Sequence, residues 1–357
     1  MLSGRHRAGE TSRLGNLWNS AENQTKIILF WNKLYSRPDY GFGFGRQPFV
    51  DWNCSECRCY ATADRSLFSQ SAAVVFHLFG RRISHPHYRL PVRARADQIY
   101  VMAIFESPLR LFYNVSRYVD QFNLTYSYLN RPETDLFCPH GAILSLEKPD
   151  PGRMPSKETI RRKSGLVAWV VSNCKARSMR NEYVKELRKY LPVHVYGRCG
   201  NGSCPARECL FTIFDRYKFY LAFENSYCRD YVTEKLYRTL EHVVVPVVLG
   251  AANYSKVAPR GAVIDVRRFR SPRHLAGYLN WLDANDDAYL NYFRWKKRFF
   301  VKRRDTCRAA AVCKLCQILH NKRYGYKRHF DPHGYWDEDR WCSTGRPLRD
   351  IIHLNDL

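Results

Sequence analysis

The residues best suited to chemistry lie in one stretch, FYLAFENSYCRDYVTEKLYRTLEHVVVPVVLGAANYSKVAP, at positions 219–259. Asp230 or Thr233 can cap a helix whose first turn holds Glu234 and Lys235. Free N–H groups and the helix dipole favour an anion at that end, and Lys235 adds a full positive charge. Glu234 can accept hydrogen bonds from ribose hydroxyls, as carboxylates do in dinucleotide sites. The stretch therefore predicts a site for a phosphorylated nucleoside. The competing interpretation is an ordinary βαβ unit with solvated charges.

Alternating strands and helices must position these residues. Phe219–Phe223 and Val243–Leu249 are short apolar runs typical of buried strands, and Gly250 ends the second run. The same alternation extends to both sides. Strands are predicted at Leu166–Val171, Val193–Gly197 and Ala262–Val266, and helices at about 179–190 and 272–282. Repeated βαβ units predict an α/β domain with a parallel sheet.

A second α/β domain is predicted earlier in the chain. Its strands are expected at the apolar runs Thr25–Trp31, Ala73–Phe79 and Gln98–Phe105. Residues 145–164 are rich in proline and charge, which is typical of a linker. The expected organisation is a disordered segment 1–23, a first domain 24–150, a linker 151–165, a second domain 166–320 and a tail 321–357.

Composition limits the classes of function. With 357 residues, 45% of them hydrophobic, the chain can bury two domain cores. Its net charge of +25 indicates an anionic partner: a nucleic acid, an anionic membrane surface or a phosphorylated small molecule. Basic clusters occur at Arg161–Lys163 and Lys296–Arg304, but no RNP, zinc-finger or basic-zipper pattern accompanies them. Nucleic-acid binding is therefore the minor interpretation.

The cysteines and glycosylation sequons favour a secretory compartment. Nine of the 13 cysteines are grouped at 54, 57 and 59, at 199, 204 and 209, and at 307, 313 and 316. Disulfides and zinc ligands are the two interpretations; the irregular spacing, with no histidine at ligand spacing beside the groups, favours disulfides. The odd number leaves at least one thiol unpaired or intermolecular. Sequons start at Asn23, Asn53, Asn114, Asn123, Asn201 and Asn253.

The motifs FYLAFENS, DYVTEKL, VVPVVLG, ANYS and AP resemble the signature of the inverting α1,3-fucosyltransferases of glycosyltransferase family 10. They are most similar to the invertebrate C-type branch, and the resemblance covers roughly residues 24–320. It implies an α/β GT-B architecture, with two Rossmann-like domains facing a cleft and the donor held by the C-terminal one. The implied reaction moves L-fucose from GDP-β-L-fucose to a GlcNAc residue of glycoprotein N-glycans. The resemblance also implies that no metal or other cofactor is required, and that a divalent cation at most stimulates the rate.

The resemblance also assigns roles to residues. Glu106, in the triplet Glu-Ser-Pro after the run 98–105, matches the general base, and Pro108 helps to fix its loop. Arg180 and Lys235 match the cations that stabilise the departing diphosphate. The further donor-contacting positions are Ser172, Asn173, Tyr220, Asn225, Tyr231 and Glu234. Taken singly, each has a plainer interpretation: a surface carboxylate, a solvated helix charge, a core tyrosine or a turn asparagine.

Some positions depart from the family pattern or stay ambiguous. Ala73 stands where relatives often carry Asp, which puts one acceptor contact in doubt. Cys313-Lys-Leu-Cys316 resembles the family's C-terminal Cys-x-x-Cys and is expected to form disulfides, whereas pairing among Cys54, Cys57 and Cys59 is open. His77, His85 and His87 are candidate second bases, although His77 lies on an apolar strand where a core or cleft role is favoured. No role is assigned to the tail.

Localisation and rival functions follow from the same observations. No window holds 18 consecutive apolar residues, and the first twenty residues lack the apolar core of a signal peptide. The resemblance nevertheless implies a type II Golgi membrane protein acting in the lumen, its anchor absent from this sequence. One rival is a catalytically inactive relative that binds glycans or GDP-fucose. The other, a basic nucleic-acid-binding protein, rests on charge alone.

Overall fold

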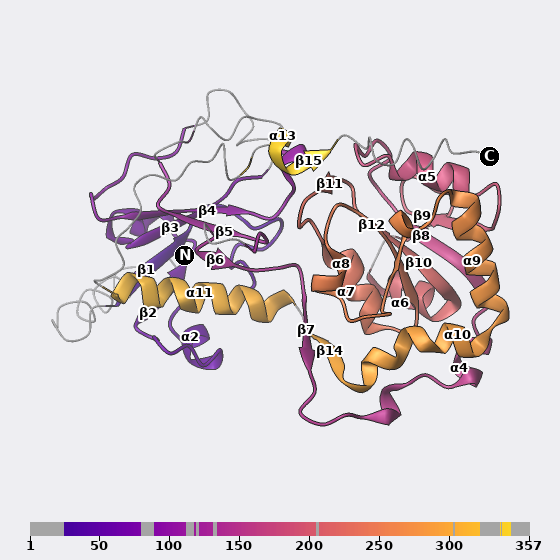
Figure 1. The fold of residues 1–357 in the computed structure, drawn as a ribbon. Coiled ribbons are helices and arrows are strands. Elements are labelled where there is room, and N and C mark those ends of the chain that lie inside the picture. The colour runs from indigo at the N-terminus through magenta and orange to yellow at the C-terminus, as the bar shows by residue number, and fades with distance from the viewer. Residues whose placement is uncertain are drawn as a thin grey trace, which may run out of the picture. The chain divides into compact units, whose positions relative to one another are not determined.

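The computed structural model describes residues 25–79, 89–111, 118, 121–130, 134–204, 207–302, 304–321, 336 and 338–343 (Figure 1). The chain forms two compact units, each assembled from separate segments. The first comprises residues 1–105, 113–138 and 305–335, and the second comprises residues 106–112, 139–304 and 336–357. Each unit contains its own parallel sheet, as expected from the apolar runs.

The first unit is built on a six-stranded parallel sheet. Its spatial order is β2 (Cys59–Thr62), β1 (Lys26–Phe30), β3 (Ala73–His77), β4 (Ile99–Ile104), β5 (Leu124–Ser127) and β6 (Leu136–Phe137). Side chains at alternate positions of β1, such as Ile28 and Phe30, enter one core cluster together with Val75 and Val101. Two short elements flank the strands, α2 (Gln47–Asp51) and the 3₁₀ turn η1 (Arg65–Gln70).

Helix α11 (Arg304–His320) covers one face of this first sheet (Figure 1). Val312, Leu315 and Leu319 recur at helical spacing and pack into the sheet's core cluster. The expected domain boundaries therefore need correction. Helix α11, in the expected second domain 166–320, belongs to the first compact unit, whereas residues 106–112 and 139–150, in the expected first domain 24–150, belong to the second. The apolar side chains of α11 decide which unit the helix joins, and no local sequence pattern indicates which of the two sheets they cover.

The second unit is a doubly wound α/β layer structure. Its five strands run parallel in the order β13 (Ile264–Asp265), β12 (Val245–Leu249), β10 (Tyr217–Phe223), β8 (Gly165–Val170) and β9 (Val193–Tyr196). Successive residues of β10 point to opposite faces. Leu221 and Phe223 enter the core under α5 (Arg180–Leu187) and α9 (Pro272–Ala284). Tyr220 and Ala222 enter the core under α6 (Arg207–Arg216) and α7 (Glu234–Glu241).

Shorter elements complete the second unit. The ribbon β7 (Ala142–Ser145) with β14 (Phe299–Lys302) and the ribbon β11 (Tyr227–Cys228) with β15 (Cys342–Ser343) are antiparallel. The remaining elements are η2 (Pro108–Arg110), η4 (Pro151–Arg153), α4 (Lys157–Arg161), α8 (Tyr254–Val257), η5 (Val266–Arg268), α10 (Asp286–Leu290), η6 (Asn291–Lys297) and α13 (Glu338–Trp341). The expected linker 151–165 is thus partly ordered, because Ile160 of α4 is buried in the core.

Two buried lysines cap helices of the second unit. Lys163 Nζ donates to the carbonyl oxygens of Phe214 and Asp215 at the end of α6, at 2.7 and 3.0 Å. Lys296 Nζ donates to the carbonyl of Leu240 at the end of α7, at 2.5 Å. Cations suit the negative end of a helix dipole. Burial nevertheless lowers the pKa of each ammonium group to about 8.

We expect this lowered pKa to make stability depend on pH. Lys296 binds its proton less tightly when folded, so its contribution to the unfolding free energy is present above its ordinary pKa of 10.5 and is lost as pH falls through about 8. Relative to Lys296→Met, the wild type should gain about 2 kcal/mol between about pH 7.5 and about pH 9.5, measured by denaturant unfolding. A difference that stays constant over this range would show that Lys296 does not deprotonate in the folded protein.

Candidate active site

The strand order of the second unit fixes where a ligand is expected. If the five strands are numbered by their order along the chain, they lie across the sheet in the order 2-1-3-4-5. The direction of the connections therefore reverses between β8 and β10. Ligands of open α/β sheets bind outside the carboxyl ends of the strands at such a point. Arg180, the first residue of α5, spans this point: Nη1 donates to Phe223 O at 2.9 Å and Nη2 to Asn173 O at 3.2 Å. One guanidinium thus joins the ends of β8 and β10.

Arg180 is a buried cation, with a relative exposure of 3%. Burial lowers the pKa of its guanidinium, and the charges of Glu224, Tyr231 and Tyr220 act in the opposite direction. The guanidinium carbon lies 5.6 Å from the centre of the Trp169 ring. Among the residues that the structure describes, its Nε–H has no hydrogen-bond partner. A buried cation that keeps an unused donor suits an anionic ligand.

Glu224 is a central residue of this site that the sequence reasoning missed. Its carboxylate has a relative exposure of 1% and accepts hydrogen bonds from Thr233 N at 2.8 Å and Thr233 Oγ1 at 2.9 and 3.0 Å. Lys235 Nζ lies 3.1 Å from Glu224 Oε2. Burial raises the pKa of Glu224, although the nearby Lys235 opposes this. The sequence did carry a signal for Glu224: it is an acidic residue directly after a buried strand, at the carboxyl end of that strand.

Lys235 and Glu234 lie at the start of α7, as predicted. Lys235 Nζ donates to Thr233 Oγ1 at 2.7 Å and lies 3.7 Å from Glu234 Oε1. Burial alone lowers the pKa of Lys235, but Glu224 and Glu234 outweigh it and the pKa is raised. Burial likewise opposes ionisation of Glu234, yet its neighbours Lys235, His140 and Arg238 hold its pKa well below the usual range. Both groups are therefore charged at neutral pH.

The predicted helix cap is only partly correct. Thr233 occupies the N-cap position of α7, but its side chain makes no capping hydrogen bond. Its hydroxyl donates instead to the buried carboxylate of Glu224. Asp230 stands earlier in the loop, in the left-handed conformation at φ 60°. Thr233 therefore supplies no side-chain cap to the first-turn N–H groups of α7.

Glu106 is joined to the same cluster within the second unit. Its Oε2 accepts a hydrogen bond from the hydroxyl of Tyr231 at 3.1 Å. The adjacent Ser107 donates to Ser226 Oγ at 2.6 Å, and both serines are buried. Pro108 opens the 3₁₀ turn η2 directly after them. The half-buried Glu106 is thus held beside the loop that leads from β10 to α7, a juxtaposition of residues 125 positions apart.

The other predicted positions fall into two groups. Asn173 and Asn225 lie at the carboxyl ends of β8 and β10, where Asn173 O accepts from Arg180 and Asn225 Oδ1 accepts from Ser226 Oγ at 2.9 Å. Ser172 is exposed on the same edge. Tyr220 is instead largely a core residue: its ring packs 5.0 Å from that of Phe214, and burial raises its pKa to about 12.

In the first unit the core interpretation of His77 holds. The residue ends β3 and is buried, with Nδ1 3.1 Å from Lys33 O. Its backbone is held by Asn32, two residues after the end of β1, whose amide donates to His77 O and accepts from His77 N, each at 2.8 Å. Ala73, the departure from the family pattern, is fully buried in the strand core. The candidate bases His85 and His87 lie outside the described residues.

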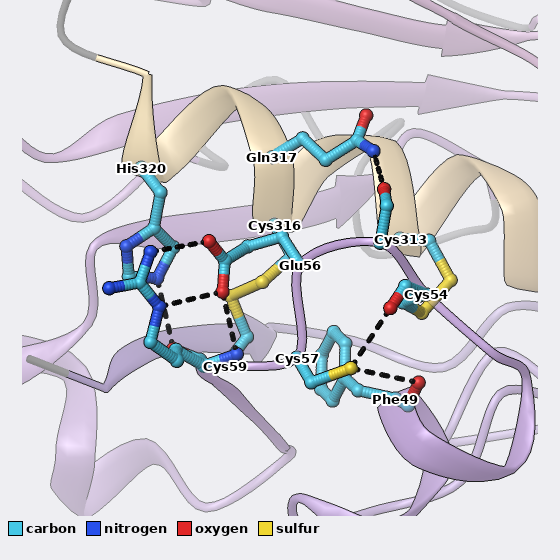
Figure 2. Close-up of a disulfide and its surroundings, with 11 residues drawn as sticks. Phe49, Cys54, Glu56, Cys57, Cys59, Cys313, Cys316, Gln317 and His320 are labelled. Atoms are coloured by element: carbon cyan, nitrogen blue, oxygen red, sulfur yellow. Dashed lines mark hydrogen bonds and ion pairs between the residues drawn. A yellow bond between two sulfur atoms is a disulfide. The ribbon is translucent and has the colours of Figure 1, made fainter. Parts of the chain in front are cut away.

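The cysteines form six disulfides, as the secretory interpretation predicted. Three lie in the first unit (Cys54–Cys313, Cys59–Cys316 and Cys138–Cys307) and three in the second (Cys174–Cys199, Cys204–Cys209 and Cys228–Cys342). Cys313 and Cys316 both form disulfides, each to the Cys54–Cys59 segment (Figure 2). Cys57 is the free thiol left by the odd number and donates to Cys54 O at 2.9 Å.

A histidine does lie beside one cysteine pair, contrary to expectation. The side-chain ligand atoms of Cys59, Cys316 and His320 lie within 4.8 Å of one another. His320 follows Cys316 by one helical turn of α11, so the two share a face (Figure 2). Because the two sulfur atoms are bonded to each other, they are not the thiolates that zinc requires. This cluster is therefore a disulfide with a neighbouring imidazole.

Three of the six sequon asparagines, Asn53, Asn201 and Asn253, are exposed, and Asn123 is half-buried. Asn253 Oδ1 caps α8 by accepting from Ser255 N at 3.2 Å, which leaves its amide nitrogen available. Asn23 and Asn114 lie outside the described residues. Within the described part of the chain, every helix is too short or too polar to cross a membrane.

Two units on parallel sheets, with charged residues gathered at the carboxyl edge of the second sheet, match the architecture of the GT-B glycosyltransferases. A family model described as "Fucosyltransferase, N-terminal" matches residues 23–141. A second, "Glycosyltransferase family 10 (fucosyltransferase) C-term", matches residues 160–331. The chain belongs to glycosyltransferase family 10, the fucosyltransferases. The fold class and the family inferred from the motifs are both confirmed.

Individual proteins similar to this chain are also fucosyltransferases. Alpha-(1,3)-fucosyltransferase C of Drosophila melanogaster is 31% identical, over 92% of this chain and 80% of that protein. Human 4-galactosyl-N-acetylglucosaminide 3-alpha-L-fucosyltransferase FUT6 is 36% identical, over 88% of this chain and 84% of that protein. The crystal structure of an alpha1,3-fucosyltransferase with GDP-fucose matches with a TM-score of 0.54 at 15% identity, covering 86% of this chain and 93% of that one. At that identity, the match supports the fold.

Proposed function

We propose that this fucosyltransferase moves L-fucose from GDP-β-L-fucose to a GlcNAc residue of glycoprotein N-glycans, forming an α1,3 linkage with inversion. The proposal draws on the names of the two relatives described above, an alpha-(1,3)-fucosyltransferase and a 3-alpha-L-fucosyltransferase, and on the donor bound in the related crystal structure. The observation that carries it is the hydrogen bond from Tyr231 to Glu106, which ties a carboxylate to the loop between β10 and α7; the same tyrosine interacts electrostatically with Arg180.

The chemistry follows from these charges. Inversion is a single in-line displacement, so one carboxylate is enough: Glu106 takes the proton of the acceptor hydroxyl as its oxygen attacks the anomeric carbon. The bond from that carbon to the diphosphate breaks, and GDP leaves with the electron pair. Arg180 and Lys235 stabilise the developing negative charge, and the start of α7 adds its dipole. The remaining negative charge of GDP needs no proton when cations are already in place.

The donor contacts are proposed by position. Glu234 is held ionised, so it can accept hydrogen bonds from the ribose hydroxyls. Asn173, Asn225 and the exposed Ser172 lie at the carboxyl ends of β8 and β10, where they can contact the nucleotide sugar. Tyr231 orients Glu106, and the buried Tyr220 supports the packing behind α7. We propose that the first unit serves the acceptor.

We propose that the protein acts in the Golgi lumen as a type II membrane protein, like the family that its motifs resemble. Six disulfides and exposed sequons support a secretory compartment. No metal is proposed as a requirement, and a divalent cation is expected at most to stimulate the rate. Nucleic acid is not a proposed partner, because a nucleotide-phosphate site and a basic surface account for the charge.

Transfer assays test this function directly. Protein expressed through a secretory pathway is supplied with GDP-fucose and a panel of core and antennal N-glycan acceptors, with EDTA in one arm. We expect transfer that survives EDTA, and the favoured acceptor identifies which GlcNAc is modified. Loss of transfer in EDTA, restored by a divalent cation, would contradict the metal-independent mechanism.

GDP binding by the same protein separates the rivals. Tight GDP binding without transfer to any acceptor would favour an inactive relative that holds the donor or glycans. Salt-sensitive retention of RNA with no affinity for GDP would favour the nucleic-acid interpretation instead.

A further inference from the structure

The C-terminal tail, to which the sequence reasoning gave no role, meets the candidate active site. Among the tail residues that the structure describes, Glu338–Trp341 form α13 and Cys342–Ser343 form β15. The strand β15 pairs antiparallel with β11, so that Cys342 opposes Cys228 and Ser343 opposes Tyr227. The strand β11 lies in the loop between β10 and α7, the loop that carries Asn225 and Tyr231.

Three kinds of contact hold the tail to this loop. The disulfide Cys228–Cys342 is covalent, and its Cys228 side is fully buried. The N–H of Arg229 donates to Trp341 O at 2.7 Å. The guanidinium carbon of Arg229 also lies 5.6 Å from the centre of the Trp341 ring. On the loop side, these contacts involve Cys228 and Arg229, which lie within the three residues before Tyr231.

The tail also reaches the segment that carries the proposed base. Helix α13 packs against η2, the turn Pro108–Arg110. Glu106 and Ser107 immediately precede that turn and bond to Tyr231 and Ser226 of the loop. The tail is therefore in contact with both of the segments whose meeting places Tyr231 on Glu106.

The loop has little regular structure of its own to fix it. Its only strand, β11, is two residues long, and a two-stranded ribbon of this size is not stable without further support. Asp230, directly before Tyr231, has φ 60°, a left-handed conformation that is uncommon outside glycine, asparagine and aspartate. The partner strand and the disulfide are the constraints nearest to this residue.

We propose that residues 338–343 are a positioning clamp for the active site, in which the Cys228–Cys342 bond and the β11–β15 pairing hold Tyr231 against Glu106. Cys228 and Cys342 are positioning residues, because they act through the loop. The inference rests on the proposed fucosyl transfer, in which Glu106 is the base. An error of about 1 Å in the placement of a catalytic group costs on the order of 100-fold in rate.

The test is a double variant, Cys228→Ser with Cys342→Ser, assayed for kcat and KM with each substrate. The matched control is Cys204→Ser with Cys209→Ser, which removes another disulfide of the same unit. We expect kcat to fall about 10- to 100-fold in the first variant and to change less than about 2-fold in the control. The KM for GDP-fucose should change much less than kcat, since Arg180 and Lys235 are held by other contacts.

A double-mutant cycle with Tyr231→Phe separates positioning from general loss of structure. If the clamp acts through Tyr231, removing the tyrosine hydroxyl and removing the disulfide are not additive, so the triple variant is hardly slower than the slower parent. Additive losses, or unchanged kcat in the cysteine variant, would overturn the inference. If the cysteine variant fails to fold, Trp341→Ala serves in its place, because it loosens the clamp without touching a disulfide.

The wild-type protein, measured in the same assays, distinguishes a failure of the proposed function from a failure of the proposed clamp. Wild-type protein that neither binds GDP nor transfers fucose contradicts the proposed function itself. Wild-type protein that transfers fucose alongside a cysteine variant of equal kcat contradicts the clamp alone.

Discussion

Replacing Glu106 by glutamine should lower the rate of fucose transfer about 1,000-fold and leave GDP binding nearly unchanged. General base catalysis contributes roughly 10²- to 10⁴-fold, and the amide cannot accept the acceptor's proton. Glutamine is close in size to glutamate and retains a carbonyl oxygen that can accept the hydrogen bond of Tyr231, which in the wild type is 3.1 Å long. The fold of the loop should therefore survive. The measurement is kcat with GDP-fucose and the best acceptor, together with the Kd for GDP by calorimetry.

Glu147→Gln is the matched control for this variant, because Glu147 is an exposed carboxylate of the same unit. Its kcat should equal that of the wild type. If Glu106→Gln retained more than about a tenth of the wild-type kcat, another group would have to take the proton. A parallel loss of GDP affinity would instead point to a change in the donor loop.

Arg180→Lys should lower kcat/KM about 100- to 1,000-fold and weaken GDP binding as well. The wild-type guanidinium donates to two backbone carbonyls at the ends of β8 and β10 and keeps its Nε–H unused. Lysine supplies a charge of the same sign but no planar fork, so it cannot satisfy both carbonyls and also present a donor to a diphosphate. Both effects should appear in the GDP Kd and in the transfer rate.

Part of the lost activity and GDP affinity in Arg180→Lys will come from a less stable fold. Leaving a buried carbonyl of Phe223 or Asn173 unpaired costs about 1–3 kcal/mol, so the free energy of unfolding must be measured beside activity. Arg188→Lys is the matched control, since Arg188 is exposed at the other end of the same helix. Wild-type GDP affinity in Arg180→Lys, at lowered stability, would make Arg180 a structural bridge between strands and remove it from the leaving-group site.

The strands of the second unit were predictable because they are short apolar runs, and β10, β12 and β13 are buried along their whole length. The predicted run 219–223 corresponds to β10, although the strand starts earlier, at Tyr217, whose ring packs in the core. The helix at 272–282 corresponds to α9, with Ser271 as a capping residue that accepts from His274 N at 3.2 Å. Such local patterns carry strand and helix identity without reference to the rest of the chain.

The parts that escaped prediction depend on contacts between distant segments. Glu224 was overlooked because its burial becomes evident only when Thr233 and Lys235 are folded back onto it. The pairing of Cys54 with Cys313 spans 259 residues and leaves no local trace. The meeting of Glu106 with Tyr231 is of the same kind. The motif resemblance suggested the individual residues, but not the hydrogen bonds that join them.

The late position of α11 in the chain has a consequence for how the protein is made. One apolar face of the first sheet is covered by Val312, Leu315 and Leu319, which leave the ribosome after the whole sheet of the second unit. Until then the nascent first unit exposes that face, and the sulfur partners of Cys54, Cys59 and Cys138 have not been synthesised. The unfinished first unit therefore exposes apolar surface during most of translation. A fragment cut before residue 304 should aggregate rather than fold.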